Sequence, residues 1–140
     1  MRTAGAVVWA DKKLHKAFGG RVSLVALAGL PSLRLTTTGR KSGQLRSTNL
    51  LYFPHGADLV LTASNWGRPH DPAWALNLRA NPKAQVALKG RPGEVVAREL
   101  HGEEYDTMWR ELLGFWPGYA MEQQEAGRRL PVFLLTPVAG

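Results

Sequence analysis

The sequence predicts an α+β fold with a small antiparallel β-barrel and flanking helices. Most predicted strands follow one another through short turns, which is typical of antiparallel hairpins. The predicted helices are too sparse to alternate with the strands as in a parallel βαβ sheet. The expected order is a helix, roughly three strands, a helix, two strands, a helix and a strand. A chain of 140 residues is long enough to bury the core of one such domain.

Residues 1–30 are expected to form an amphipathic helix and an apolar segment ahead of a barrel domain at residues 31–140. Residues 1–18 mix apolar side chains, among them Trp9 and Phe18, with three lysines. Such a helix either packs on the domain or lies on a membrane surface, and both interpretations stay open. Residues 22–30 are mostly apolar, but a bilayer span needs about 20 residues. Charges interrupt the first apolar run, which is unlike a secretory signal.

The segment at residues 33–38 is predicted to be a strand, because apolar and β-branched residues suit a half-buried pleated surface. The chain then turns between Gly39 and Gly43, and residues 47–53 are predicted to form the next strand. This makes the segment a hairpin with a glycine at each end of its turn.

The turn of this hairpin gathers three cations and a hydroxyl group, from Arg40, Lys41, Arg46 and Ser42. Arginine offers paired donors that match phosphate or carboxylate, and glycines allow backbone N–H groups to face an anion. The spacing of a Walker A loop is absent, and no helix pattern follows. From the residues alone, two interpretations stay open: the turn is an oxyanion site, or it is a charged, solvent-exposed hairpin.

The middle of the chain is predicted to hold a strand and then a helix. Residues 58–63 are the strand. Asp71 is expected to cap a helix that begins at Pro72, since proline is favoured at the first helical position. The helix is expected to end near Ala80, because another proline follows two residues later.

The last part of the chain is predicted to form a hairpin, a helix and a strand. Residues 84–88 and 94–100 are the strands of the hairpin, joined by a turn at residues 89–93. An acidic amphipathic helix follows over residues 103–113 and is broken by an aromatic, proline-containing stretch. Residues 130–136 form the last strand.

The chain lacks the usual catalytic sets. It has no cysteine, which excludes disulfides, thiolate metal sites, iron–sulfur clusters and a cysteine nucleophile, and fits a cytoplasmic protein. Its four histidines are scattered, so no metal site is predicted. The GxSxG and GxGxxG motifs are absent. An anion receptor with aromatic neighbours and no catalytic set indicates a cofactor that carries the chemistry.

The net charge of +7 is unevenly distributed. Residues 1–93 carry +11, and residues 94–140 carry −4. A polyanionic partner is therefore expected to meet the first part of the chain. The candidates are nucleic acid, a membrane surface, and a cofactor with phosphate and carboxylate groups.

Three stretches of the sequence carry motifs of a known family. They are TTTGRKSGQLR at residues 36–46 with Leu51 and Tyr52 beyond it, PAWALNLRANP at residues 72–82, and Arg128 followed by Leu130-Pro131-Val132. They closely resemble the deazaflavin-dependent nitroreductase family. The resemblance implies a split β-barrel related to FMN-binding barrels, and binding of coenzyme F420, a deazaflavin with a phosphate and an oligoglutamate tail. Related barrels often dimerise, so a homodimer is compatible with it.

The resemblance also implies which residues form the site. The deazaflavin ring is expected to lie under Leu51 and Trp74, with the phosphate and tail at the cationic turn. Tyr52, Ser64 and Tyr119 are the candidate catalytic residues that contact the substrate. Core packing is the alternative role for Tyr52 and Trp74, and capping is the alternative for Ser64. The cofactor-binding set is Arg40, Lys41, Ser42, Arg46, Leu51, Ser64, Asn65, Ala73, Trp74 and Asn77.

The implied function is an oxidoreductase that uses reduced F420 as hydride donor to a quinone, an enone or a nitro compound. The nitroimidazole-reducing branch has a tyrosine where this chain has Glu122, so the substrate stays open. Two alternatives remain, an FMN-binding split-barrel oxidoreductase and a non-enzymatic carrier of F420 or flavin. No nucleic-acid partner is expected, since base recognition requires exposed stacking aromatics near the cations. The expected location is cytoplasmic, with membrane association through residues 1–30 as an option.

Overall fold

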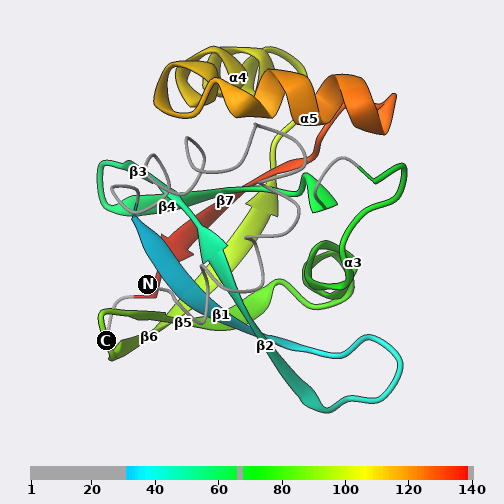
Figure 1. The fold of residues 1–140 in the computed structure, drawn as a ribbon. Helices are drawn as coiled ribbons and strands as arrows, with labels where there is room; N and C mark the ends of the chain where they lie inside the picture. Colours follow the sequence, from blue (N-terminus) through cyan, green and yellow to red (C-terminus); the bar gives the residue numbers. More distant parts are fainter. Residues whose placement is uncertain (1–30, 66–67, 139–140) are drawn as a thin grey trace.

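Seven strands form one antiparallel sheet in the computed structural model, which describes residues 31–65 and 68–138 (Figure 1). The order across the sheet is β2-β1-β5-β6-β7-β4-β3. The described residues also form three helices. The elements are β1 (Ser32–Thr38), β2 (Leu45–Leu51), β3 (Phe53–His55), β4 (Asp58–Thr62), α3 (Ala73–Ala80), β5 (Lys83–Leu88), β6 (Arg91–Glu99), α4 (Gly102–Phe115), α5 (Gly118–Ala126) and β7 (Val132–Pro137).

The two edge strands of the sheet are neighbours in the sequence, and this makes the sheet a split barrel. β2 is one edge and β3 is the other, yet only Tyr52 separates them. The sheet must therefore curl until its edges meet at Tyr52, whose N–H donates to the carbonyl of Pro31 at 3.1 Å. Away from Tyr52, β2 pairs only with β1, so the barrel is open along that edge. The predicted α+β split β-barrel is confirmed.

The interior of the curled sheet holds the larger hydrophobic core. Alternate residues of the strands point inward, as the two-residue period of a strand requires. Leu35 is fully buried, and α3 contributes Trp74 and Leu78 to the same cluster. The ring of Trp74 packs edge-on against Phe133, with 5.7 Å between the ring centroids. α3 is thereby held against the sheet on the side of β1.

A second core lies on the other face of β4 and β7. Val60 and Val132 point away from the barrel interior and pack under α4 and α5, the helix pair at the top of Figure 1. Tyr105 of α4 donates a 2.5 Å hydrogen bond to the buried carbonyl of Leu130. β4 and β7 are thus covered on both faces, which fixes α5 relative to the barrel.

Two strand and turn predictions differ from the structure. The strand predicted at residues 47–53 is split at Tyr52, where the chain passes from one edge of the sheet to the other. The turn predicted at residues 89–93 is shorter, because Lys89 and Gly90 both adopt positive φ and β6 begins at Arg91. The stretch of β6 around Pro92 pairs only with β5, so its missing N–H is tolerated.

Asp71 was expected to be the N-cap of the helix, and that prediction is wrong. The cap position belongs to Pro72, and no side chain caps the helix. The carboxylate of Asp71 instead accepts hydrogen bonds from Arg79 and Arg128. Since two guanidinium groups compete for it, the carboxylate is not available to the helix N–H groups.

Helix α5 was missed by the sequence analysis. Tyr119, Glu122 and Ala126 are its buried residues, at the i, i+3 and i+7 spacing of a helix face. A hydrophobic pattern does not reveal this face, because the residue in its middle is a glutamate. Gly127 ends the helix, and its N–H bonds to the carbonyls of Gln123 and Gln124.

The predictions made for residues 1–30 lie outside the described residues. These are the amphipathic helix, the apolar segment at residues 22–30, the domain boundary and the membrane contact. No helix in the described part of the chain is long and apolar enough to cross a membrane.

The barrel core should respond strongly to loss of one inward side chain. We expect Leu35→Ala to lower the free energy of unfolding by about 2–5 kcal/mol, because Leu35 is 0% exposed and leaves a cavity. Leu45→Ala is the matched control on the paired strand, where the side chain is 70% exposed, and should change stability by less than about 0.5 kcal/mol. Urea unfolding measures both. Equal losses would show that β1 does not bury its inward face.

Candidate active site

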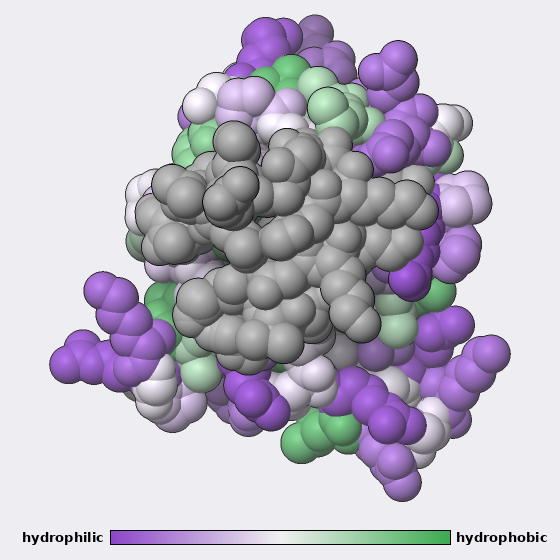
Figure 2. Space-filling model, viewed as in Figure 1, coloured by the Kyte–Doolittle hydropathy of each residue, from purple (hydrophilic) through white to green (hydrophobic). Residues whose placement is uncertain are grey.

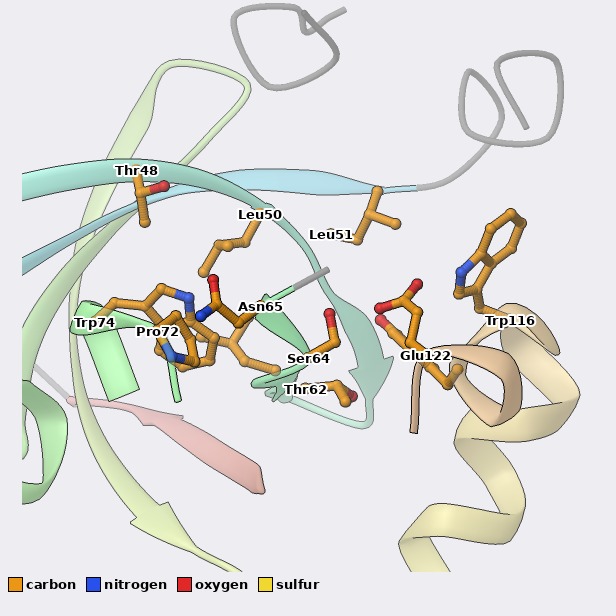
Figure 3. A pocket seen from close by; sticks show the side chains of 12 residues that line it. Thr48, Leu50, Leu51, Thr62, Ser64, Asn65, Pro72, Trp74, Trp116 and Glu122 are labelled. Atoms are coloured by element: carbon orange, nitrogen blue, oxygen red, sulfur yellow. The ribbon is translucent and has the colours of Figure 1, made fainter. Parts of the chain in front are cut away.

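A trough in two adjoining parts runs between β2, α3 and α5. Thr48, Pro72 and Trp74 line both parts and so join them. The outer part has a cavity volume of about 440 Å³ and the inner part about 150 Å³. The outer part is lined by Thr37, Gly39, Arg40, Lys41, Ser42, Arg46, Ser47, Thr48, Pro72, Ala73, Trp74 and Asn77. The inner part, shown in Figure 3, is lined by Thr48, Leu50, Leu51, Leu61, Thr62, Ser64, Asn65, Pro72, Trp74, Trp116, Tyr119 and Glu122.

The outer part is cationic. Arg40, Lys41 and Arg46 line it, and they have no carboxylate partner among the described residues. Hydrophilic residues also dominate the end of the molecule where the β1–β2 hairpin projects (Figure 2). In contrast, every ion pair formed by an arginine in the described chain lies elsewhere. Those arginines are Arg79 with Asp71 and Glu99, Arg98 with Glu104, Arg128 with Asp71, and Arg129 with Asp106.

The backbone of the cationic turn is largely occupied by its own hydrogen bonds. The N–H of Gly39 donates to the carbonyl of Gln44, and the N–H of Gly43 donates to that of Gly39, both at 2.8 Å. The N–H of Gln44 donates to Ser42 Oγ at 3.1 Å. The expectation that glycines expose N–H groups to an anion is therefore not met at Gly39 and Gly43. An anion would be bound mainly by the side chains.

The two glycines instead allow the turn to close. Gly43 has a φ of 73°, which favours glycine. A Cβ on Gly39 would lie 2.8 Å from Ser42 Oγ and 3.1 Å from the carbonyl oxygen of Gln44. The turn is compact for that reason, and its cationic side chains project from a fixed backbone.

Asn77 of α3 connects this turn to the helix. Its Oδ1 accepts a 3.0 Å hydrogen bond from the backbone N–H of Arg40, and its Nδ2 donates a 3.1 Å hydrogen bond to Thr37 Oγ1. Asn77 is 4% exposed and Thr37 2%, so both partners depend on each other for hydrogen bonding. Asn77 lines the outer part, as predicted for a cofactor-binding residue, and it also positions Arg40.

The walls between the two parts are apolar. Trp74 faces the trough and also packs on Phe133, so it serves both the site and the core, the two roles left open by the sequence. In Figure 3 Leu50 of β2 stands opposite Trp74 and Pro72, and Leu51 lies further along the strand toward Glu122. A flat ring could be held between these two sides.

The inner end of the trough is a cluster of polar groups on an otherwise apolar surface. Glu122 of α5 is 2% exposed, and the carboxylate points toward Ser64 and Trp116 in Figure 3. Burial is the main cause that raises the pKa of Glu122 to about 7. Hydrogen bonds from Ser64 and the Trp116 indole oppose this rise, and the Glu125 carboxylate adds to it.

Tyr119 lies beside Glu122 on the same helix face. Burial raises the pKa of its phenol well above the ordinary range, and the charge of Glu122 adds to the rise. The nearby Thr62 hydroxyl acts to lower the pKa of Tyr119. Its contact is too weak to count as a hydrogen bond, since Thr62 Oγ1 has no hydrogen-bond partner within the described chain. The phenol is therefore a neutral hydrogen-bonding group at any ordinary pH.

The loop that carries Ser64 and Asn65 is held by Arg128. Its guanidinium donates to the carbonyl of His70 at 2.9 Å, to that of Arg68 at 3.3 Å and to the carboxylate of Asp71. The side chain of Asn65 also donates to the carbonyl of His70, at 2.9 Å. Arg128 stood in the sequence motif without an assigned role, and the structure gives it this one.

The structure places the predicted site residues along the trough with one exception. All ten predicted cofactor-binding residues and Tyr119 line at least one of its two parts. Tyr52 lines neither part and packs against the barrel core, which was its alternative role. The roles of the lining residues in binding and catalysis stay predictions. Sequence reasoning did not assign site roles to Thr48, Leu50, Trp116 and Glu122, because these residues lie outside the recognised motifs. Pro72 stood in a motif without an assigned site role.

The described residues hold no group of three or more acidic or histidine side chains that could bind a metal ion. The chemistry available to the trough is therefore anion binding at one end, ring binding between apolar walls, and hydrogen bonding or proton transfer at the other end.

Comparison with known proteins identifies relatives over most of the chain. The sequence model of the family described as F420H(2)-dependent quinone reductase matches residues 8–137. An F420H(2)-dependent quinone reductase of Mycobacterium tuberculosis is 31% identical over 126 residues, covering 88% of this chain and 85% of that protein.

Two solved structures are also similar. One, described as an F420-H2 dependent reductase (FDR-A), is 35% identical with a TM-score of 0.68, covering 75% of this chain and 93% of that one. The other, described as a domain-swapped dimer, has the same identity and TM-score and covers 75% of this chain and 79% of that one.

Removing the Asn77 amide should loosen the cationic turn. We expect Asn77→Ala to lower the free energy of unfolding by about 1–3 kcal/mol, because the buried Thr37 hydroxyl loses its partner. The amide hydrogen of Arg40 should exchange faster with solvent, because it loses its acceptor. Urea unfolding and hydrogen exchange measure the two effects. Asn81→Ala removes only a contact to the Lys83 N–H at the end of α3 and should leave Arg40 exchange as it is.

Glu122 should impose a pH dependence on stability. Its pKa is raised in the folded state to about 7 from the ordinary 4.5, so the folded protein holds a proton that the unfolded chain releases between these values. The protonated Glu122 makes its full contribution to the free energy of unfolding below pH 4.5, and this contribution is lost as the pH rises to about 7. Relative to Glu122→Gln, the wild type should lose about 3 kcal/mol over this range. Urea unfolding across these pH values tests it, and an equal slope in both proteins would contradict it.

Proposed function

The chain belongs to the F420H(2)-dependent quinone reductase family, and on that premise we propose that it reduces a quinone whose ring binds in the inner part of the trough. It is an F420H2-dependent reductase, and its cofactor is coenzyme F420. The observation that carries the proposal is the trough itself, which joins a set of unpaired cations to a small cavity lined with hydrogen-bonding groups.

The outer part fits the anionic end of the cofactor. A phosphate and an oligoglutamate tail need several cations that are not already neutralised, and Arg40, Lys41 and Arg46 meet that need. Asn77 fixes the backbone of Arg40, so the attachment point of this side chain is set before the cofactor binds. The longer tail of F420 uses this cationic set more fully than the single phosphate of FMN, the alternative that the residues alone left open.

The apolar walls would hold the ring of the cofactor. Trp74 and Pro72 form one side and Leu50 forms the other, and Thr48 continues this wall toward the cations. When bound, reduced F420 supplies a hydride. The side chains contribute orientation and exclusion of water, which lower the entropic part of the barrier.

The inner part has room for about one six-membered ring. Its volume of about 150 Å³ is similar to that of an engineered apolar cavity that binds benzene. The hydroxyl groups of Ser64 and Tyr119 and the carboxyl group of Glu122 line it. These groups can donate hydrogen bonds to carbonyl oxygens, which a quinone presents on its ring and which become negative on reduction.

We further propose that residues 31–140 form the cofactor-binding domain and that the protein forms a homodimer. The similarity to a solved domain-swapped dimer supports the second point. The cytoplasmic location and the membrane contact of residues 1–30 stay predictions.

Cofactor binding should depend on the unpaired cations. We expect Arg40→Ala and Lys41→Ala each to weaken F420 binding about 10- to 100-fold, because each loses a charge-assisted contact. The wild-type affinity should also fall as salt is raised, and less steeply in the variants. Titration of F420 fluorescence measures both.

Arg98→Ala is the matched control, because Arg98 is exposed on β6 and paired with Glu104, away from the trough. Its affinity for F420 should equal that of the wild type. Unchanged affinity in the Arg40 and Lys41 variants would place the anion site elsewhere.

Steady-state assays with a soluble naphthoquinone, an enone and a nitroaromatic compound then compare the electron acceptors. A preference for either of the last two would overturn the quinone assignment.

A further inference from the structure

We propose that Glu122 is the catalytic residue that protonates the reduced substrate in the inner part of the trough. This inference rests on the proposed function, because it concerns the same site and the same acceptor. Glu122 lies outside the sequence motifs, and its hydrogen bonds within the described chain do not explain why a carboxyl group is buried there.

The position of Glu122 suits this role. Its side chain comes from the middle of α5 and is 2% exposed, and it lines the inner cavity. Its Oε1 atom has no hydrogen-bond partner within the described chain. A buried carboxyl oxygen without a partner is costly, and such groups are retained where a ligand or a reaction uses them. A carbonyl oxygen in the cavity would be such a partner.

The surroundings keep Glu122 protonated up to about neutral pH. Burial raises its pKa to about 7, so both forms are accessible under ordinary conditions. The groups that act on it come from three parts of the chain. Ser64 and Trp116 favour the charged form through hydrogen bonds, whereas the exposed Glu125 carboxylate favours the neutral form. Tyr119 faces it as a neutral phenol.

Glu122 is a better proton donor here than the other hydroxyl groups of the cavity. The pKa of Tyr119 lies well above its ordinary range, since burial and the charge of Glu122 both disfavour the phenolate. Ser64 is an alcohol and acts on the Glu122 carboxyl as a hydrogen-bonding partner. Tyr119 and Ser64, the earlier candidates for contact with the substrate, are then positioning groups for the carbonyl oxygen.

The step balances in atoms and charge. When a C–H bond of the reduced deazaflavin breaks, the quinone accepts the hydride and becomes a hydroquinone anion with its negative charge on oxygen. The oxidised ring is left with one positive charge, which is lost as an N–H proton to solvent. The O–H bond of the Glu122 carboxyl breaks, and the proton forms a new O–H bond on that oxygen. The neutral hydroquinone leaves, and the Glu122 carboxylate regains a proton from solvent before the next turnover.

This role predicts a distinct pH profile. In the wild type, kcat/KM for the quinone should fall as the pH rises through about 7, because the carboxyl group loses its proton. In Glu122→Gln, kcat/KM should be lower by about 100-fold below pH 7 and should lose that pH dependence, because the amide keeps the shape but has no acidic proton. Glu111→Gln makes the same chemical change on the exposed face of α4 and should keep the wild-type profile.

A second measurement does not depend on turnover. Infrared difference spectra of the cofactor-free wild type should show a protonated carboxyl C=O band that disappears as the pH rises through about 7. The band should be absent from Glu122→Gln and present in Glu111→Gln. If no such band titrates near neutral pH, Glu122 does not hold the proton and the inference is overturned.

The outcomes separate this inference from the proposed function. F420 binding, followed by fluorescence, should be the same in the wild type and in Glu122→Gln. If both proteins bind F420 and reduce the naphthoquinone with equal kcat/KM and equal pH profiles, the proton-donor role is overturned and the proposed function stands. If the wild type binds no F420 while the infrared band titrates as expected, the proposed function fails and the protonation state of Glu122 stands.

Discussion

The curl of the sheet is the constraint on which the rest of the structure depends. Because β2 and β3 are opposite edges joined only by Tyr52, the sheet closes at that point and stays open along the rest of β2. The opening gives the trough its place, with β2 on one side and β4 on the other. Tyr52 therefore shapes the site from the core without lining it.

Three segments far apart in the sequence meet at this opening, and each is fixed by a different interaction. Asn77 holds the cationic turn to α3, Arg128 holds the loop of Ser64, and the second core holds α5 against β4 and β7. The cations come from the turn and the proton donor comes from α5, so the order of these groups along the trough follows from the topology.

The sequence was most informative where local pattern and motif coincide. The cationic turn, the helix at α3 and the barrel class were predictable, because glycines, proline and strand periodicity each act over a few residues. The role of Asp71 was not, since its partners Arg79 and Arg128 are brought to it by the tertiary fold. Helix α5 and the importance of Glu122 escaped for a related reason, because a buried glutamate resembles a solvent-exposed one until its neighbours are known.

The burial of Glu122 has a consequence for how this protein can change. A carboxyl group inside a helix–sheet interface is a position where many apolar or neutral replacements would make the fold more robust. A screen for heat resistance alone would thus tend to discard it, whereas a screen for turnover would keep it. The residue marks a place where stability and activity are under opposing selection, and laboratory evolution of this scaffold would expose the conflict there.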